Sequence, residues 1–169
     1  AVLMPNSDIE DSNPISLNES FAIALWVNFA QSKSTYVINN FQGVAASYVG
    51  NSILLHADPS GSDVQIKGHI DDNSNPTQWN GAVLNLNQWY HVVMIRYKGD
   101  NASFYVDGVF DSSTSDVTTK NVLSDLPWII GARLDGGTEI PGAEFFNGSI
   151  DEVMIFNTSL NATEILDIY

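Results

Sequence analysis

The sequence predicts an all-β fold that ends in one short helix. Short stretches rich in Val, Ile, Phe, Tyr and Trp recur along the chain, and clusters of Gly, Asn, Asp, Pro or Ser close each of them. Within these stretches apolar side chains alternate with the period of two that places them on one face of a strand. With 169 residues, 44% of them hydrophobic, the chain can bury a core, so we expect a single domain over residues 1–169.

Three stretches indicate how the strands are buried. Residues 21–29 carry large apolar side chains at every second position, which predicts one face packed in a core. Residues 91–97 are largely apolar on both faces, as expected of a central strand that is covered on both sides. Residues 64–70 alternate between apolar and polar side chains, which predicts a strand with one polar face.

Turn and cap residues mark where the chain reverses and where the helix begins. Asp107-Gly108 supplies the positive φ angles of a tight two-residue hairpin, and residues 98–101 predict a reversal just before it. Asn161 and Glu164 fit a variant of the capping box, and apolar residues recur after them with helical spacing. We therefore expect one short helix at the C-terminal end of the sequence.

The charge balance excludes several classes of partner. Twenty acidic residues against six basic ones give a net charge of -14. Such a charge repels phosphate backbones and anionic lipid heads, so nucleic acid and membrane surfaces are not expected partners. No apolar run approaches the roughly 18 residues of a membrane span, so we expect no membrane insertion. The sequence has no cysteine, which rules out disulfides and thiolate metal sites.

From about residue 15 onward, four sequence blocks stand in the order and spacing of a known family. They are FAIALW at residues 21–26, WYHVV at 89–93 with FYVDG at 104–108, IGAR at 130–133, and FNGSIDEV at 146–153 running into IFN at 155–157. The sequence thereby resembles laminin G-like, concanavalin A-like lectin (jelly-roll) domains. The resemblance implies a two-sheet antiparallel jelly-roll β-sandwich with one concave sheet, and ligand sites on the concave face or at the loop rim.

One departure from the family concerns the N-terminal region. Members of the family usually begin with a further strand, which pairs beside the strand that carries the Asp151 block, whereas residues 1–4 here resemble the second strand. Either the irregular N-terminal segment replaces the missing strand, or an edge is open for pairing with neighbouring sequence or with another chain.

Catalysis is not expected from the acidic residues. Laminarinase-type glycosidases resemble this fold, but their chemistry needs two carboxyls about 5 to 9 Å apart. Asp8 and Glu10 alternate within a polar turn, and Asp151 and Glu152 are expected on opposite faces of a strand. His56, His69 and His91 lack the spacing of a metal pair, and we expect His91 to be a hydrogen-bonded core residue. The sequence therefore predicts that the protein is not an enzyme.

Calcium is the cofactor that the resemblance implies, because it takes oxygen ligands. Similar domains hold a structural ion that maps here onto the Asp151 side chain, the Gly43 carbonyl and an N-terminal residue near Asp8. The alternative is that Asp151 only caps a turn or bonds to the backbone. A second candidate is the acidic, glycine-rich loop with Asp135 and Glu139, whose alternative is an ordinary solvated loop.

Sugar recognition would use an exposed aromatic ring with a few polar groups around it. Trp79 follows a polar stretch and is the best candidate for an exposed platform, with Tyr48 and Arg133 as candidates at the rim. Trp26 and Trp89 are expected in the core.

Five Asn-x-Ser/Thr sequons indicate a glycosylated extracellular or cell-surface protein. They begin at Asn18, Asn101, Asn147, Asn157 and Asn161, and all five are expected to be exposed, Asn101 above all because it follows a turn. The leading hypothesis is a non-catalytic binding or adhesion module that takes a glycan or an extracellular protein as its partner. The alternative is a structural subunit or spacer that acts through protein-protein contacts.

Overall fold

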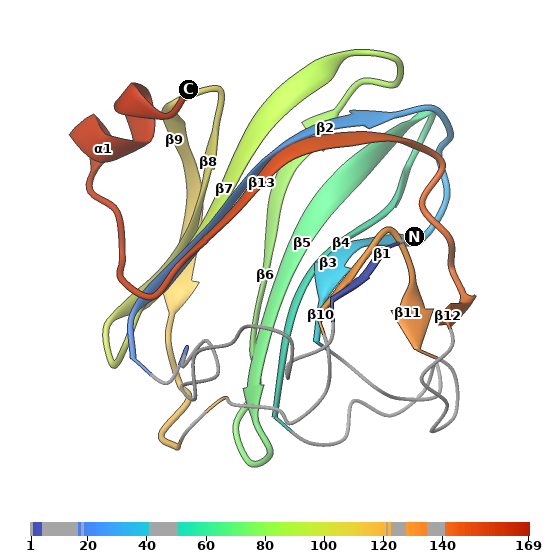
Figure 1. The fold of residues 1–169 in the computed structure, drawn as a ribbon. Helices are drawn as coiled ribbons and strands as arrows, with labels where there is room; N and C mark the ends of the chain where they lie inside the picture. The colour runs from blue at the N-terminus through green and yellow to red at the C-terminus, as the bar shows by residue number, and fades with distance from the viewer. Residues whose placement is uncertain are drawn as a thin grey trace.

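Two stacked antiparallel sheets form the fold (Figure 1). The computed structural model describes residues 2–4, 17, 19–40, 51–120, 122, 128–134 and 141–169. The six-stranded sheet contains, in spatial order, β1 (Val2–Met4), β10 (Trp128–Ile130), β3 (Thr35–Asn39), β4 (Asn51–Ser60), β5 (Asp63–Asp72) and β6 (Thr77–Leu84). The five-stranded sheet contains β13 (Gly148–Phe156), β2 (Phe21–Phe29), β7 (Trp89–Tyr97), β8 (Asn101–Val106) and β9 (Val109–Ser115).

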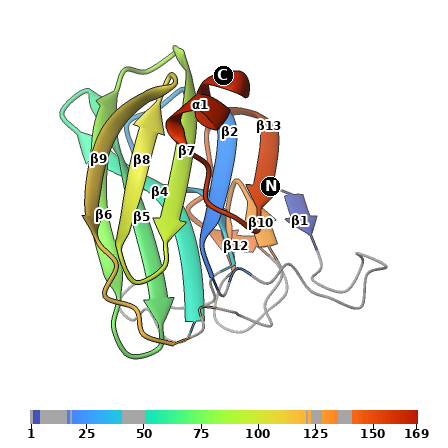
Figure 2. The ribbon, with the colours of Figure 1, turned by 90° about the vertical axis from the view of Figure 1, so that its left-hand side faces the viewer.

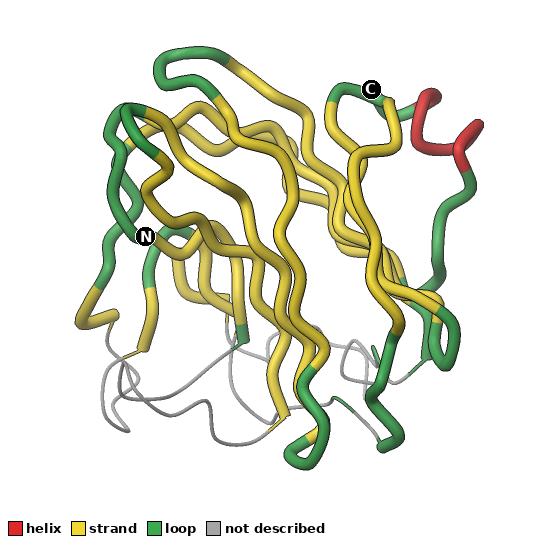
Figure 3. Tube along the Cα trace, turned by 180° about the vertical axis from the view of Figure 1, so that it is seen from behind, coloured by secondary structure: helices red, strands yellow, loops and turns green. Residues whose placement is uncertain are grey.

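Two smaller elements complete the described chain. Strands β11 (Arg133–Leu134) and β12 (Pro141–Ala143) form a separate antiparallel pair. Helix α1 (Ala162–Asp167) is the one helix of the described residues, and strand makes up most of the rest (Figure 3). The predicted all-β sandwich with a short C-terminal helix is therefore confirmed.

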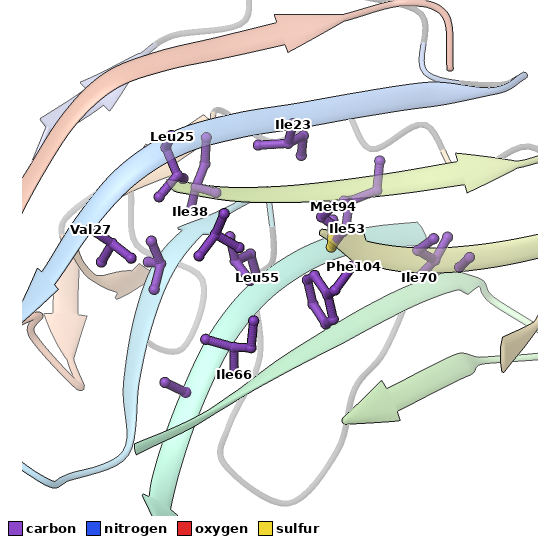
Figure 4. Close-up of a cluster of buried hydrophobic side chains, with 14 of the residues drawn as sticks. Ile23, Leu25, Val27, Ile38, Ile53, Leu55, Ile66, Ile70, Met94 and Phe104 are labelled. Carbon is purple, nitrogen blue, oxygen red and sulfur yellow. The ribbon is translucent and has the colours of Figure 1, made fainter. Parts of the chain in front are cut away.

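The core lies between the two sheets, where alternate residues of strands such as β2, β4, β5 and β7 point inward (Figure 4). On β2 the predicted apolar face is buried at all five positions, from Phe21 to Phe29. It packs with residues of the opposite sheet such as Ile53, Leu55 and Ile66. Burying each of these side chains contributes about 1.5 to 3 kcal/mol, so this layer is the main source of stability.

Helix α1 covers part of the outer face of the five-stranded sheet (Figure 2). Its Ile165 packs with Ala24 of β2 and Val93 of β7 in a second apolar cluster. Strand β7 is therefore buried on both faces, as its composition predicts. The helix begins at a capping box, because the Asn161 side chain accepts from the Thr163 and Glu164 amides and the Glu164 side chain accepts from the Asn161 amide.

The predicted turns adopt the expected backbone. Asp107 and Gly108 have φ angles of 51° and 75°, as a two-residue hairpin between β8 and β9 requires. Gly99, in the reversal between β7 and β8, has a φ angle of 74°.

The described N-terminal strand does not pair beside the strand that carries Asp151. Strand β1 pairs with β10 in the six-stranded sheet, whereas β13 pairs with β2 and, within the described residues, is an edge of the five-stranded sheet. The β13 ladder is interrupted by a bulge between Asp151 and Met154, in which Glu152 has a φ angle of 48°. A bulge of this kind hinders the addition of another strand, so the edge gives no support to strand pairing with a second chain.

Candidate ligand-binding site

A cavity of about 320 Å³ opens on the outer face of the six-stranded sheet, across β4, β5 and β6. The inner residues of these strands fill the core, so the alternate residues turn outward and line the cavity. The outward-facing lining residues are His56, Asp58, Lys67, His69, Gln78 and Asn80, and the inner positions Gly68 and Trp79 complete the lining. The strand register brings them together, because His56 lies opposite Lys67, Lys67 opposite Asn80, and His69 opposite Gln78.

The two oppositely charged residues of the cavity neutralise each other. The Lys67 ammonium donates a hydrogen bond to the Asp58 carboxylate at 2.7 Å, and both side chains are about one-third exposed. Burial acts to raise the pKa of Asp58, but the hydrogen bonds from Lys67 and Ser34 outweigh it and lower the pKa below its usual value. The Asp58 carboxylate therefore stays ionised at neutral pH and offsets the charge of the Lys67 ammonium.

Both histidines of the cavity are neutral at physiological pH. Burial lowers the pKa of His56 to about 4 and that of His69 to about 4. The His56 ring stacks on Tyr36 with 5.7 Å between ring centroids. His69 is fully buried, and its Nε2 lies 3.8 Å from Asp71 Oδ2, whose pKa is itself raised by burial.

Two side-chain amides provide the exposed hydrogen-bonding groups. Gln78 and Asn80 point outward from β6 and are solvent-exposed. Each amide offers two donors and an acceptor. Together with the remaining Lys67 protons, these groups suit a ligand that carries several hydroxyls, and the cavity is large enough for a small ligand.

The comparisons with known proteins agree with this fold. The sequence matches the Laminin_G_3 family, described as the concanavalin A-like lectin/glucanases superfamily, over residues 6–166. The chain belongs to this superfamily. No curated protein matches the sequence.

Solved structures of this superfamily's fold include several sugar-binding proteins. The sialidase CBM40 of Ruminococcus gnavus, bound to alpha2,3 sialyllactose, is similar with a TM-score of 0.74 at 13% identity, covering 98% of this chain and 90% of that one. Domain 4 of the arabinanase AbnA of Geobacillus stearothermophilus, in complex with arabinotriose, has a TM-score of 0.61 at 17% identity, covering 89% and 67%. Botulinum neurotoxin type C, from a study of its interaction with two ganglioside molecules, has a TM-score of 0.58 at 14% identity, covering 90% of this chain and 36% of that one. At these identities the likeness shows the fold alone.

The prediction that Trp79 forms an exposed platform is wrong. Trp79 is 7% exposed and points into the core, where its ring lies 5.0 Å from that of Phe104 in the opposite sheet. Strand β6 begins at Thr77, so the residue that follows a polar stretch in the sequence is the third residue of a strand. The exposed groups of the cavity are instead Gln78 and Asn80, polar side chains that in the sequence are indistinguishable from ordinary surface residues.

The rim candidates are placed differently from the expectation. Arg133 is buried, its Nε donates to Glu144 Oε2 at 2.8 Å, and its guanidinium lies over the Tyr36 ring. Arg133 therefore packs against the sheet and is not among the residues that line the cavity. Tyr48, Asp135 and Glu139 lie outside the described residues.

Part of the predicted calcium site can be located. Asp151 is exposed on the outer face of β13, and its Oδ1 accepts from the Glu152 amide at 2.9 Å. Gly43 and Asp8 lie outside the described residues. Among the residues that the structure describes, no group of three acidic, histidine or cysteine side chains is arranged to hold a metal.

Three expectations about the five-stranded sheet are wrong. Trp89 is 42% exposed on the outer face of the sheet, and Trp26 is partly exposed on the same face, so neither lies in the core. Asp151 and Glu152 do not diverge, because the bulge lets both line a second cavity on this face. His91 is buried as expected, yet within the described chain neither of its ring nitrogens has a hydrogen-bond partner.

The described sequons lie mostly at the surface. Asn147, Asn157 and Asn161 are exposed. Asn101, which we expected to be the most exposed of the five, is half-buried instead. It pairs with Tyr97 and Ser115 in the sheet. Asn18 lies outside the described residues. Within the described residues, no helix has the length and apolar character needed to cross a membrane.

Proposed function

We propose that the chain is a non-catalytic, extracellular binding module that takes a neutral glycan on the outer face of its six-stranded sheet. The observation that carries the proposal is the lining of the 320 Å³ cavity by amide, imidazole and ion-paired groups. A glycan offers hydroxyls that both donate and accept, and each hydrogen bond contributes about 0.5 to 1.5 kcal/mol net. Several such bonds in a preformed cavity give a specific complex of modest affinity.

The charge of the cavity favours an uncharged sugar. Sialyllactose, the ligand of the Ruminococcus gnavus module, carries a carboxylate, whereas arabinotriose, the ligand of the arabinanase domain, carries none. Lys67 is the one cationic side chain of the described lining, and Asp58 already neutralises it. The net charge of -14 adds a repulsive field, so an acidic sugar has no compensating partner here.

The same lining supports binding rather than hydrolysis. Glycoside hydrolysis uses two carboxyls flanking the bond that is cleaved. Asp58 is the one carboxylate among the described residues of the cavity, and Lys67 holds it in an ion pair.

A glycan array tests the proposal. We expect the protein to bind uncharged glycans, and the double substitution Gln78→Ala with Asn80→Ala to weaken binding by at least about tenfold, since two or more hydrogen bonds are lost. Val83→Ala is the matched control, because Val83 is exposed on the same strand but does not line the cavity. Matched glycans with and without sialic acid test the charge argument. Preference for the sialylated member, or no effect of the double substitution, would contradict the proposal.

A structural calcium ion at Asp151 is a further part of the proposal. The exposed carboxylate is a suitable oxygen ligand, and the family resemblance supplies the carbonyls near Gly43 and Asp8 as its partners. Such an ion would add roughly 2.7 kcal/mol at a concentration a hundredfold above its dissociation constant.

Chelation tests the ion. We expect EDTA to lower the melting temperature of the wild-type protein, and Asp151→Ala to lower it by the same amount and to abolish the response to EDTA. An unchanged wild-type melting temperature in EDTA would exclude a stabilising ion at this position.

The extracellular setting rests on the sequons. Three of the described acceptor asparagines are exposed, so glycans there would meet no steric obstacle from the fold.

A further inference from the structure

A second cavity, of about 330 Å³, lies on the outer face of the five-stranded sheet, on the opposite side of the sandwich from the proposed glycan cavity. It is lined by Trp26, Trp89, Asp151, Glu152 and Tyr169. These residues come from β2, β7, β13 and the segment after α1, and the register explains their meeting. Trp26 lies opposite Asp151 on one side and opposite His91 on the other.

Three aromatic residues line this cavity, and the rings of two of them contact each other and a buried histidine. The rings of Trp26 and Tyr169 stack with 5.6 Å between centroids and 21° between planes. The buried His91 ring lies 5.3 Å from Trp26 and 5.8 Å from Tyr169. Trp89 adds a third aromatic side chain, and this residue is 42% exposed. An exposed tryptophan beside two further aromatic rings is a feature of binding sites rather than of an ordinary sheet surface.

The rim of the cavity is negative and uncompensated. The bulge brings the adjacent Asp151 and Glu152 to the same cavity, at the cost of a left-handed backbone at Glu152. None of the ion pairs within the described chain involves either carboxylate. Burial lowers the pKa of His91, although Asp107 and Glu152 act to raise it, so at neutral pH the imidazole carries no balancing charge.

Aromatic faces and carboxylates favour the same kind of ligand. The face of an aromatic ring attracts a cation through its quadrupole, and this attraction is strongest when several rings surround a weakly hydrated cation. The two carboxylates at the rim also attract a cation by Coulomb interaction. The described lining contains no Lys, Arg, Asn or Gln side chain that would hydrogen-bond the hydroxyls of a sugar or the oxygens of an anion.

We propose that the Trp26-Trp89-Tyr169 cavity binds an organic cation with a methylated ammonium group, which contacts the aromatic rings and is attracted by Glu152 and, in the calcium-free protein, by Asp151. A quaternary ammonium fits better than a primary one, because it needs no hydrogen-bond acceptors and is cheaper to remove from water. This site is independent of the glycan cavity, since the two share no residue.

Choline is the probe, and binding is followed by tryptophan fluorescence and by calorimetry on the full chain. All titrations contain EDTA, so that a calcium ion at Asp151 makes no contribution. We expect saturable choline binding, with 3,3-dimethylbutan-1-ol, the neutral isostere of choline, and ethanolamine, which lacks the three methyl groups, each at least about tenfold weaker. Trp89→Ala should weaken choline binding by about 3- to 30-fold and Glu152→Gln by about 3-fold, with weaker binding at high salt.

Matched variants distinguish this site from the glycan cavity. The Gln78→Ala, Asn80→Ala double variant should bind choline like the wild type, so loss of the glycan function leaves this result standing. Thermal unfolding of Trp89→Ala checks that the variant is folded, and Glu152→Gln tests the charge without changing the shape. If the protein co-sediments with phosphatidylcholine vesicles, the ammonium group belongs to a lipid headgroup. If it binds choline but does not co-sediment, the ammonium group belongs to a free solute. Either outcome supports an ammonium site in this cavity.

Three outcomes would overturn the proposal. Equal affinity for the neutral isostere would show that the cavity is only an apolar pocket. Binding of an uncharged pyranose that depends on Trp89, without binding of choline, would make it a second sugar site. No saturable signal with choline would show that the cavity does not recognise an ammonium group.

Discussion

Gly68 and Trp79 show how one missing side chain makes room for one large one. They lie opposite each other on β5 and β6, and the indole ring extends across the space that a Cβ at Gly68 would occupy. This position lets the ring reach Phe104 in the other sheet. The pair therefore contributes to packing between the sheets directly beneath the glycan cavity, and the shape of the cavity floor depends on it.

This arrangement predicts the effect of Gly68→Ala. The added methyl overlaps the indole ring, so we expect a loss of about 1 to 3 kcal/mol in the free energy of unfolding, measured by urea denaturation. Trp79→Phe alone should also destabilise, because it leaves a cavity. In the double variant the smaller ring accommodates the methyl, so the combined loss should be less than the sum of the two single losses. Strict additivity would show that the two side chains do not compete for the same space.

Trp79 and Trp89 show why the sequence does not determine the exposure of single residues. The polar stretch before Trp79 favours a loop, although Thr77, Trp79 and Gly81 alternate with outward-facing polar residues and so share the inner face of a strand. The apolar composition of both faces of β7 predicts a buried Trp89. Only the three-dimensional arrangement shows that α1 covers one part of that outer face and leaves Trp89 beyond it.

Among the elements, β13 is a strand that a bulge interrupts. Its inward residues Ile150, Val153 and Ile155 are separated by three positions and then by two, which follows from the bulge after Asp151. In the sequence, residues 153–156 are all apolar, so the pattern does not show which of them point inward. Strict alternation therefore places Asp151 and Glu152 on opposite faces, and the bulge is the reason why that expectation is wrong. On β2 the period is regular throughout, so it is sufficient to predict the buried face.

The start of β13 depends on a glycine, and this predicts the effect of Gly148→Ala. Gly148 has a φ angle of 152°, and a Cβ there would overlap the carbonyl oxygen of Asn28 on β2. We expect a loss of roughly 2 kcal/mol or more in the free energy of unfolding, because backbone rather than a flexible side chain must move. Gly99→Ala is the control: its φ angle is also positive, but nothing lies near a Cβ there, so backbone strain alone should cost about 1 kcal/mol. Equal losses for the two variants would contradict the role of the Asn28 contact.

At the scale of the whole molecule, buried polar residues connect the sheets on one side of the sandwich. Arg96 of β7 donates to Asp116 at 2.8 Å, and Asp116 accepts from Thr77 of β6 at 3.1 Å. Asp72, at the end of β5, accepts from four backbone amides, those of residues 74, 75, 119 and 120. Burial acts to raise the pKa of Asp72, but these hydrogen bonds outweigh it and lower the pKa to about 2.

The pKa shifts predict that stability falls in two stages as the pH is lowered. The neutral, buried His69 has a pKa of about 4 in the folded protein, against 6.5 for the unfolded chain. Between these values the unfolded state binds more protons, so the contribution of His69 is complete above pH 6.5 and is lost as the pH falls to 4, by roughly 3 kcal/mol. His56 acts in the same range and with the same sign. Asp72 then loses its contribution as the pH falls from 3.8 to about 2.

Denaturation with urea at a series of pH values separates the two stages. His69→Gln should remove part of the slope between pH 6.5 and 4 while leaving the slope below pH 4, and Asp72→Asn should do the reverse. The raised pKa of Asp71 opposes the His69 effect just above pH 3.8, so the difference between wild type and His69→Gln is more informative than either curve alone. A wild-type stability that stays constant from pH 7 to 4, with His69→Gln parallel to it, would show that His69 does not remain neutral in the folded protein. The His69 imidazole that lines the glycan cavity would then be charged, and Lys67 would no longer be the one cationic side chain of the described lining, which would weaken the argument for an uncharged ligand.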